Sequence, residues 1–359
     1  MDTDVLIVGG GIAGLSAGAA LAPHGAVTVL EAESALAYHA SGRSAALFEP
    51  RYGPAPVVAL SQASEAAFRS MPGVLSPRGL MVWAAPGEDA AFEAEARAMD
   101  LAEIAVEEAR ARVPVLNPAA VARVAAADHA RDIDTDALVQ RHARAIRAAG
   151  GRVVTGAGVT AVARAGAGWR VETAAGSFAG AILVDAAGAW ADRVATMAGV
   201  ATLGLTPLRR SMARIPPPGG HDVAGWPMVF GTGESWYAKP DAGALIVSPA
   251  EEDPADPHDA WACDLVLAEG LARYEAMVTE PVTRILANWA GLRTFAPDRI
   301  PAIGFAADAP GFVWLAGQGG YGFQTSPAAA ALAADLILGR PPAIDDGTLA
   351  ALSPARFSR

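Results

Sequence analysis

The chain contains very little cysteine and very little lysine. Cys263 is the only cysteine among its 359 residues, and Lys239 is the only lysine among 27 basic residues. One cysteine excludes an internal disulfide and a cysteine cluster for zinc or iron–sulfur, and an isolated cysteine is more often an inert packing residue than a reactive thiol. One lysine leaves almost no candidate for a Schiff base. We therefore expect no metal site and no imine chemistry on the protein itself.

An excess of positive charge and a long apolar run are also missing. The formal net charge is −11, which disfavours nucleic acid and anionic membrane surfaces as partners, because both are bound by clustered cations. No run of about 18 uncharged apolar residues occurs, so we expect no transmembrane segment. The apolar pattern begins at residue 4 without the features of a signal peptide, and we expect a cytoplasmic location.

The chain does contain a dinucleotide-binding pattern between Asp4 and Glu31. Four apolar residues typical of a buried parallel strand are followed by a helical pattern and by a second strand, Val27–Leu30. Glu31 ends that strand, where an acid accepts hydrogen bonds from a ribose. The first strand leads into a G-x-G-x-x-G turn, which permits a tight bend, close approach of the backbone to a pyrophosphate and close helix packing; its glycines are Gly9, Gly11 and Gly14.

Two further glycine-rich turns follow strand patterns and precede helix patterns. They lie near Gly188 and Gly320, so three separated segments could close on one ligand. A nicotinamide dehydrogenase needs one such fingerprint, and FAD, a larger and permanently held cofactor, therefore fits better than NAD. Backbone N–H groups and the helix dipole at the third turn could stabilise negative charge on a reduced flavin.

Helix and strand patterns alternate along the rest of the chain. Helices are expected over 57–71, with Ser61 and Ser64 facing outward, and over 328–338, with Ser326 as N-cap. Residues 207–288 are rich in strand patterns and read as an antiparallel sheet.

These patterns predict an α/β protein of two domains. The first is a Rossmann-type FAD-binding domain with a parallel sheet, and the second is a substrate-binding domain with a mostly antiparallel sheet flanked by helices. Because each pattern recurs in separated stretches, we expect the FAD-binding domain to be discontinuous. It would comprise residues 1–48, 134–206 and 289–359, and the substrate-binding domain would comprise residues 49–133 and 207–288.

Several segments also resemble the FAD-dependent D-amino-acid oxidase superfamily, most closely its D-arginine dehydrogenase and glycine oxidase branch. The similarity covers nearly the whole chain. It rests on the glycine turn with Glu31 and on segments 39–46, 185–190, 289–293 and 318–326. The resemblance implies that FAD is held by Gly9, Gly11, Ile12, Ala13, Gly14, Glu31, Ala32, Ser41, Arg43, Ser44, Ala45, Val159, Ala187, Gly188, Trp190, Arg293, Gly319, Gly320, Tyr321, Gly322, Phe323 and Gln324.

The resemblance further implies oxidation of an α-amino acid, with transfer of the Cα hydrogen as hydride to flavin N5 and hydrolysis of the imino acid to a keto acid and ammonia. Arg210 and Arg293 match the family's carboxylate-binding arginines, and Tyr237 matches a tyrosine that adds a hydroxyl. Arg210, next to Arg209, could instead be a surface cation. The catalytic and substrate-contacting set is Arg210, Tyr237, Arg293, Tyr52, Gln324, Gly320, Glu49, Leu47 and Leu80.

The side chain of the substrate is predicted from two departures. Leu80 replaces an acid that receives a guanidinium in the D-arginine branch, and Leu47 replaces a histidine, so we expect a neutral or hydrophobic D-amino acid. The Glu49 carboxylate, however, could restore a place in the pocket that binds a cationic substrate side chain. None of the six histidines is placed as a base; His129 and four others read as surface or packing residues, while His39 lies in the cofactor loop.

Three other functions stay open. A secondary-amine oxidase acting on glycine, sarcosine or proline would use the same cofactor site, a flavin-binding assembly subunit would lack turnover, and an NAD-dependent enzyme would be colourless. The electron acceptor, either oxygen or a quinone or other compound, and the oligomeric state do not follow from residue order.

Overall fold

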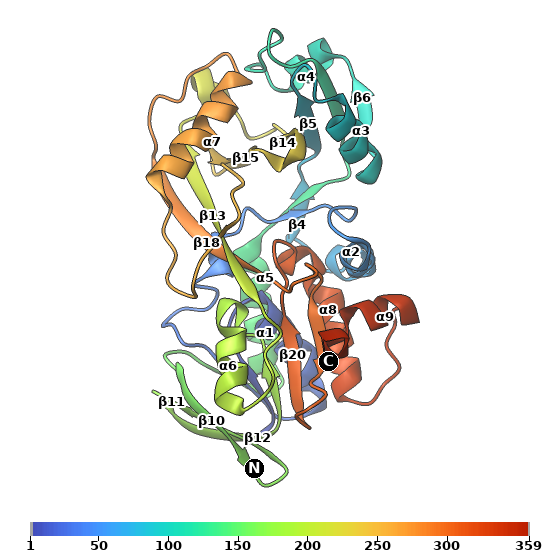
Figure 1. Ribbon diagram of the computed structural model, residues 1–359, viewed down its shortest axis with the longest axis vertical. Helices are drawn as coiled ribbons and strands as arrows, with labels where there is room; N and C mark the ends of the chain where they lie inside the picture. Colours follow the sequence, from blue (N-terminus) through green and yellow to red (C-terminus); the bar gives the residue numbers. More distant parts are fainter. Residues whose placement is uncertain (1–2, 358–359) are drawn as a thin grey trace.

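A computed structural model describes residues 3–357 of the chain, which form an α/β fold with two large sheets, one above the other along the long axis (Figure 1). The lower sheet has a parallel core and an antiparallel extension, as expected for a Rossmann-type domain. Its strands are β1 (Thr3–Val8), β2 (Val27–Leu30), β9 (Arg152–Val154), β10 (Val159–Ala165), β11 (Gly168–Thr173), β12 (Gly176–Asp185), β19 (Ala302–Phe305) and β20 (Phe312–Ala316).

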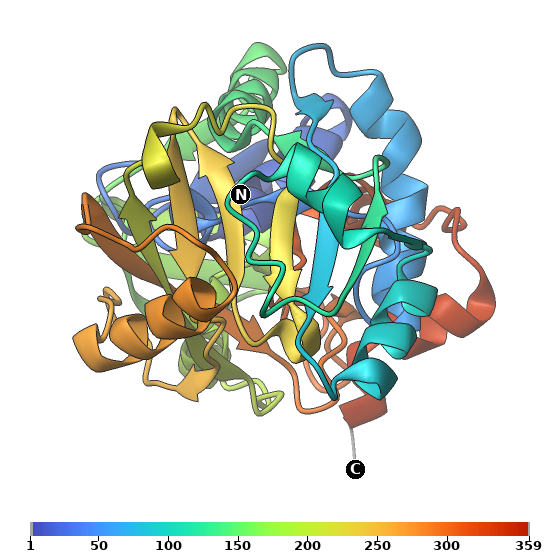
Figure 2. The same cartoon turned by 90° about the horizontal axis from the view of Figure 1, so that it is seen from above.

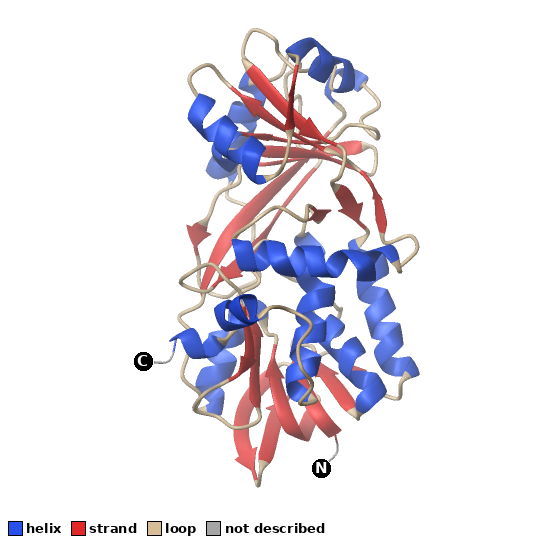
Figure 3. Cartoon of the chain, turned by 90° about the vertical axis from the view of Figure 1, so that its right-hand side faces the viewer, coloured by secondary structure: helices blue, strands red, loops and turns tan. Residues whose placement is uncertain are grey.

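The centre of the lower sheet is buried on both faces. Leu6 and Ile7 of β1 point to opposite faces and are both fully buried, which is why an unbroken apolar run was needed there. Helices α1 (Ile12–Leu21), α5 (Thr135–Ala148) and α8 (Gly322–Ile337) cover one face, with α1 packed on both α5 and α8 (Figure 3). Helix α6 (Ala191–Ala198) packs against β10 and β12 instead.

The upper sheet is antiparallel except where β14 runs parallel to β5. Helices α3 (Asp89–Ala98), α4 (Val106–Arg112) and α7 (Asp264–Ala276) pack on it, as Figure 2 shows from above. Its strands are β5 (Leu80–Ala84), β6 (Ala102–Ile104), β7 (Arg123–Ala127), β13 (Thr206–Ile215), β14 (Met228–Gly231), β15 (Tyr237–Asp241), β16 (Ala244–Ser248), β17 (Asp253–Pro254) and β18 (Ala287–Phe295).

A small third sheet lies between the two large ones. It consists of β3 (Leu47–Phe48), β4 (Leu75–Pro77) and β8 (Arg131–Ile133), and α2 (Ala55–Arg69) and α9 (Asp346–Leu352) lie beside each other nearby. We propose that the chain divides into two domains close to the boundaries expected from the sequence. Residues 289–295 differ, because they were expected in the FAD-binding domain, whereas β18 pairs with β13 and so belongs to the upper sheet.

Two details differ from the sequence expectation. Ser61 and Ser64 are fully buried rather than outward-facing, because α2 packs on α8 and the Ser64 hydroxyl accepts a hydrogen bond from the Ala328 amide at 3.1 Å. Helix α8 starts at Gly322, before the expected Ser326 cap. Pro327 lies inside the helix and cannot donate to the Phe323 carbonyl, which accepts a bond from the Ser326 hydroxyl at 2.9 Å instead.

None of the helices within residues 3–357 combines the length and the apolar character that crossing a membrane requires.

Candidate functional site

A cleft of about 480 Å³ opens at the carboxyl ends of the parallel strands β1, β2 and β12. This edge is where ligands bind in open α/β sheets. The N-termini of α1 and α8 both line the cleft, through Ile12 and Phe323 among others. The positive dipole ends of two helices therefore face the same space, an arrangement suited to a phosphate-bearing ligand.

The glycines of the first turn are required by close packing. Gly9 has φ = 114°, and a Cβ there would collide with the Ala186 carbonyl, while a Cβ at Gly14 would collide with the Gly9 carbonyl. The Glu31 carboxylate braces this turn, because it accepts hydrogen bonds from the Gly10 amide at 2.7 Å and the Glu33 amide at 2.8 Å. Burial raises the pKa of Glu31. A carboxylate has about four acceptor positions, so Glu31 can also accept from a ribose.

Most residues expected to hold FAD line this cleft. They are Gly9, Gly11, Ile12, Ala13, Glu31, Ala32, Ser41, Arg43, Ser44, Val159, Ala187, Gly188, Trp190, Arg293, Gly319, Gly320, Gly322 and Phe323. Four do not: Gly14 packs α1 on the strand, Tyr321 packs against Tyr52 and Phe295, and Ala45 and Gln324 line a second cavity.

The far end of the cleft also lacks side chains where a large ligand would need room. Gly319 has φ = 54°, and a Cβ there would overlap the Phe295 ring. Gly320 lies against the Arg293 guanidinium, with its ideal Cβ position 3.2 Å from Nη1. The three glycine turns thus meet around one elongated cleft with two helix N-termini, and the residues present fit FAD.

Asp185 lies beneath this cleft at the end of β12 and is fully buried. Its Oδ1 accepts from the Ala187 amide at 3.1 Å and its Oδ2 has no partner. Burial raises the pKa of Asp185 well above its usual value, with the Asp192 charge adding to the shift. The Asp185 carboxyl therefore keeps its proton to a higher pH in the folded protein than in the unfolded chain.

This raised pKa predicts a stability effect of Asp185→Asn. A folded pKa above the unfolded value of about 3.9 means that the wild type loses stability as pH rises above about 4, by at most about 1.4 kcal/mol for each pH unit. The variant lacks this group, so its free energy of unfolding relative to wild type should increase from pH 5 to pH 8. Urea unfolding at both pH values, with FAD in excess, measures the difference; a constant difference would contradict the burial of an ionisable carboxyl.

A second cavity of about 90 Å³ lies between the upper sheet and the N-terminus of α8. It is lined by all nine residues expected in the substrate site: Leu47, Glu49, Tyr52, Leu80, Arg210, Tyr237, Arg293, Gly320 and Gln324. The sequence did not reveal Met99, Met228, Phe230 and Glu234, which also line it. None of these four belongs to a motif. Met228 and Phe230 reach the cavity because β14 pairs with β5, which places Met228 opposite Leu80.

Two arginines line both cavities and come from one pair of strands. Arg210 lies on β13 opposite Gly291, and Arg293 lies on β18 opposite Leu208, so the two side chains share a face of the sheet as diagonal neighbours. This register, which depends on residues 83 positions apart in the chain, places two cations at the junction of the cavities.

Both guanidiniums have unused donors. Arg210 is 3% exposed; its Nη2 donates to Glu252 Oε1 at 3.1 Å, but its Nε and Nη1 have no partner. Burial and the neighbouring Arg293 charge lower the pKa of Arg210. Arg293 makes no hydrogen bond or ion pair with any residue in 3–357; burial lowers its pKa, but the surrounding Tyr237, Tyr52 and acidic groups raise it overall. The alternative that Arg210 is a surface cation is wrong.

Two tyrosines complete the polar side of the second cavity. The Tyr52 hydroxyl donates to Glu234 Oε2 at 2.8 Å, and the Tyr237 hydroxyl contacts Met212 Sδ at 3.2 Å. Burial, followed by the Glu234 charge, raises the pKa of Tyr52 well above its usual value, so its hydroxyl stays protonated. The Tyr52 hydroxyl is therefore a neutral hydrogen-bonding group, and Tyr237 lines the same cavity.

Glu49 is paired with a histidine that the sequence gave no reason to select. Its Oε2 lies 2.7 Å from Nε2 of His129, and its Oε1 accepts from the Arg51 amide at 3.0 Å. Burial raises the pKa of Glu49, and the His129 and Arg51 interactions oppose this. Because this carboxylate is already engaged, it is a weak candidate for binding a substrate cation.

Comparison with known proteins agrees with this geometry. A family model for FAD dependent oxidoreductases matches residues 4–336. The fold is shared with glycine oxidase from Geobacillus kaustophilus (24% identity, TM-score 0.83, covering 99% of this chain and 98% of that one). It is also shared with L-proline dehydrogenase from P. horikoshii (21%, 0.85, 100% and 98%) and with FAD-bound L-alpha-glycerophosphate oxidase from Mycoplasma pneumoniae (20%, 0.85, 96% and 96%).

The family match spans both sheets and all three glycine turns, and the residues around the cleft fit the cofactor. The prediction of FAD over NAD and the predicted resemblance are thereby confirmed. The chain belongs to the family of FAD-dependent oxidoreductases that includes D-amino-acid oxidases, and FAD is its cofactor.

Proposed function

We propose that this protein oxidises the Cα–N bond of a D-amino acid with a neutral or hydrophobic side chain, giving an imino acid that hydrolyses to a keto acid and ammonia. The observation that carries the proposal is the pair of arginines with unused donors at the junction of the two cavities. Arg293 has no anionic partner within residues 3–357, and Arg210 keeps two donors free beside its bond to Glu252, so the pair is the expected counterpart of a small carboxylate.

The arginines bind and orient the substrate. A carboxylate that enters a closed site loses its hydration, and this cost is offset only by strong pairing. Guanidiniums suit this role because their planar forks make bidentate charge-assisted bonds. We propose that Arg210 and Arg293 hold the carboxylate and that the Tyr237 hydroxyl adds a further donor.

Bound FAD supplies the two-electron acceptor for the hydride that leaves Cα. The protein's contribution is position, since a fixed carboxylate restricts where Cα and the amine can lie. No histidine lines the second cavity among the described residues. We infer that the amine reacts as the neutral form and that Glu234, bound to Tyr52, is the nearest acidic group able to receive its proton.

The apolar wall supports the choice of side chain. Leu47, Leu80, Met99, Met228 and Phe230 form it. The two carboxylates of the cavity both have partners, since Glu49 Oε2 lies 2.7 Å from His129 Nε2 and Glu234 accepts from the Tyr52 hydroxyl. A neutral side chain would bury apolar surface here at about 25 cal/mol per Å², whereas a guanidinium would lose its hydration against this wall.

The named relatives support the amine class without fixing the substrate. Glycine oxidase, L-proline dehydrogenase and L-amino acid deaminase from Proteus myxofaciens share this fold. A secondary-amine substrate such as glycine, sarcosine or proline is the second candidate, and the small cavity volume of about 90 Å³ favours it over bulky substrates. The D configuration rests on the resemblance to the D-arginine branch.

Anaerobic mixing of the FAD-loaded protein with single amino acids tests the proposal. We expect the yellow absorbance to bleach fastest with D-leucine, D-methionine or D-phenylalanine, at least tenfold more slowly with D-arginine, and not with the L-enantiomers. Faster bleaching with sarcosine or proline would establish the second candidate. A protein that no amine or amino acid bleaches, although it binds FAD, would contradict both.

A further inference from the structure

The loop between β16 and α7, residues 249–263, reaches from the upper sheet to the cofactor cleft. Apart from the two-residue strand β17 (Asp253–Pro254), this loop has no regular secondary structure. His258 and Ala260 of this loop line the cleft, facing residues of the FAD-binding turns. A ligand that fills the cleft therefore contacts a loop that connects β16 of the upper sheet to α7.

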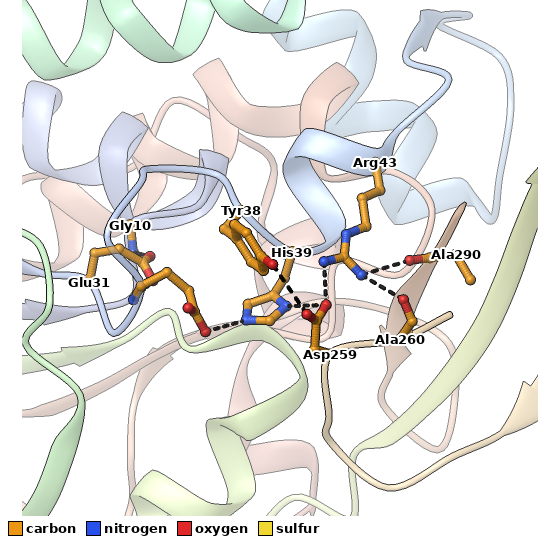
Figure 4. Close-up of polar contacts among 9 residues, drawn as sticks. Gly10, Glu31, Tyr38, His39, Arg43, Asp259, Ala260 and Ala290 are labelled. Atoms are coloured by element: carbon orange, nitrogen blue, oxygen red, sulfur yellow. Dashed lines mark hydrogen bonds and ion pairs between the residues drawn. The ribbon is translucent and has the colours of Figure 1, made fainter. Parts of the chain in front are cut away.

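The tip of this loop is fastened to the segment that follows Glu31. Figure 4 shows Tyr38, His39 and Arg43 pointing toward Asp259. The Tyr38 hydroxyl donates to Asp259 Oδ2 at 3.2 Å, His39 Nδ1 lies 4.0 Å from Oδ1, and Arg43 Nη2 donates to Oδ1. The carboxylate is thus met by three groups from one short segment.

Arg43 also binds the loop backbone. Its Nη1 donates to the Ala260 carbonyl at 2.8 Å and to the Ala290 carbonyl, on β18, at 2.9 Å. Its side chain is 15% exposed, whereas that of Asp259 is 59% exposed. Sequence reasoning expected Arg43 to reach the polar edges of the cofactor, but its guanidinium donates to three protein acceptors from two other segments.

We propose that Arg43 and Asp259 form a clasp that holds the 249–263 loop over the cofactor cleft and slows the release of FAD. The clasp joins positions 216 residues apart and closes the cleft from a side that no glycine turn covers. Breaking it frees the loop that carries His258 and Ala260, so the cleft wall opens more often and the bound nucleotide leaves faster. The inference concerns the cofactor and does not depend on the identity of the substrate.

The rate of FAD release tests the clasp. The FAD-loaded protein is diluted, and released flavin is followed by its fluorescence. We expect Asp259→Asn to release FAD roughly three- to tenfold faster than wild type, because one partly exposed charge-assisted contact is lost. Added salt should accelerate release from wild type and have a smaller effect on the variant, since the contact is partly exposed and screened.

Asp256→Asn is the matched control. Asp256 is an exposed carboxylate of the same loop whose side chain makes no hydrogen bond or ion pair with any residue within 3–357, and this variant should release FAD at the wild-type rate. Arg43→Gln completes a double-mutant cycle, and it should accelerate release by a smaller factor in the Asp259→Asn background than in wild type, because one of its contacts is already lost there. The proposal is overturned if Asp259→Asn releases FAD like Asp256→Asn, or if Arg43→Gln accelerates release by the same factor in both backgrounds, which would mean that Arg43 does not act through Asp259.

Discussion

Arg293→Ala is expected to lower kcat/KM for D-leucine by roughly 10²- to 10³-fold. The reason is that the substrate carboxylate would keep its desolvation cost and lose one of two buried cationic partners, a loss worth about 3–5 kcal/mol in comparable buried pairs. KM should account for much of the loss. Arg293→Lys should have a kcat/KM between those of the wild type and Arg293→Ala, because lysine keeps the charge and loses the planar fork. Steady-state kinetics over a range of D-leucine concentrations measures both parameters.

Arg293 also lines the cofactor cleft, so FAD content must be measured for each variant. Arg284→Ala is the matched control, because Arg284 is an exposed arginine only a few residues before β18. We expect it to leave both parameters unchanged. A fully FAD-loaded Arg293→Ala protein with wild-type kcat/KM would show that the carboxylate is bound elsewhere.

Leu80→Glu is expected to change the substrate preference. Leu80 is 2% exposed on β5 and lines the second cavity. A carboxylate at this position would give an entering cationic side chain a charged partner in the otherwise apolar wall, so the ratio of kcat/KM for D-arginine over D-leucine should rise by roughly 100-fold or more. The unpaired buried charge should also lower the melting temperature in the absence of substrate.

Leu80→Gln separates charge from size. Glutamine matches glutamate in volume and lacks the charge, so it should impair D-leucine oxidation without creating activity toward D-arginine. If Leu80→Glu gains no D-arginine activity, Leu80 does not contact the substrate side chain. A wild-type protein that already prefers D-arginine would contradict the neutral side-chain proposal and would point to Glu49 as the anion that receives the guanidinium.

Local patterns in the sequence were sufficient for the FAD-binding unit. A strand, a glycine turn and a helix are fixed by neighbours in the chain, and Gly9, Gly14 and Glu31 occupy the places that the fingerprint assigns to them. The parallel and antiparallel sheets were predicted for the same reason, since strand patterns depend on alternation within a few residues. The resemblance to a family added residues that pattern alone does not distinguish, and all nine expected for the substrate site line one cavity.

Contacts between distant segments were not available from the sequence. The Ser61 and Ser64 hydroxyls looked exposed because the α2 pattern contains no sign of the packing of α8 on it. His129 gave no signal, because its partner Glu49, which directly follows β3, lies 80 residues earlier in the chain, and the same holds for Glu234 with Tyr52, which are 182 residues apart.

The sequence by itself determined that this chain folds into a dinucleotide-binding unit with an antiparallel partner sheet, and that the cofactor is FAD. Only the tertiary structure decided how the two arginines share a strand face, which carboxylates are already paired, and that Arg43 binds a loop 216 residues away rather than standing unpaired in the cleft. The physical reason is that periodicity records which face of an element is buried, whereas side-chain partners depend on which elements pack together.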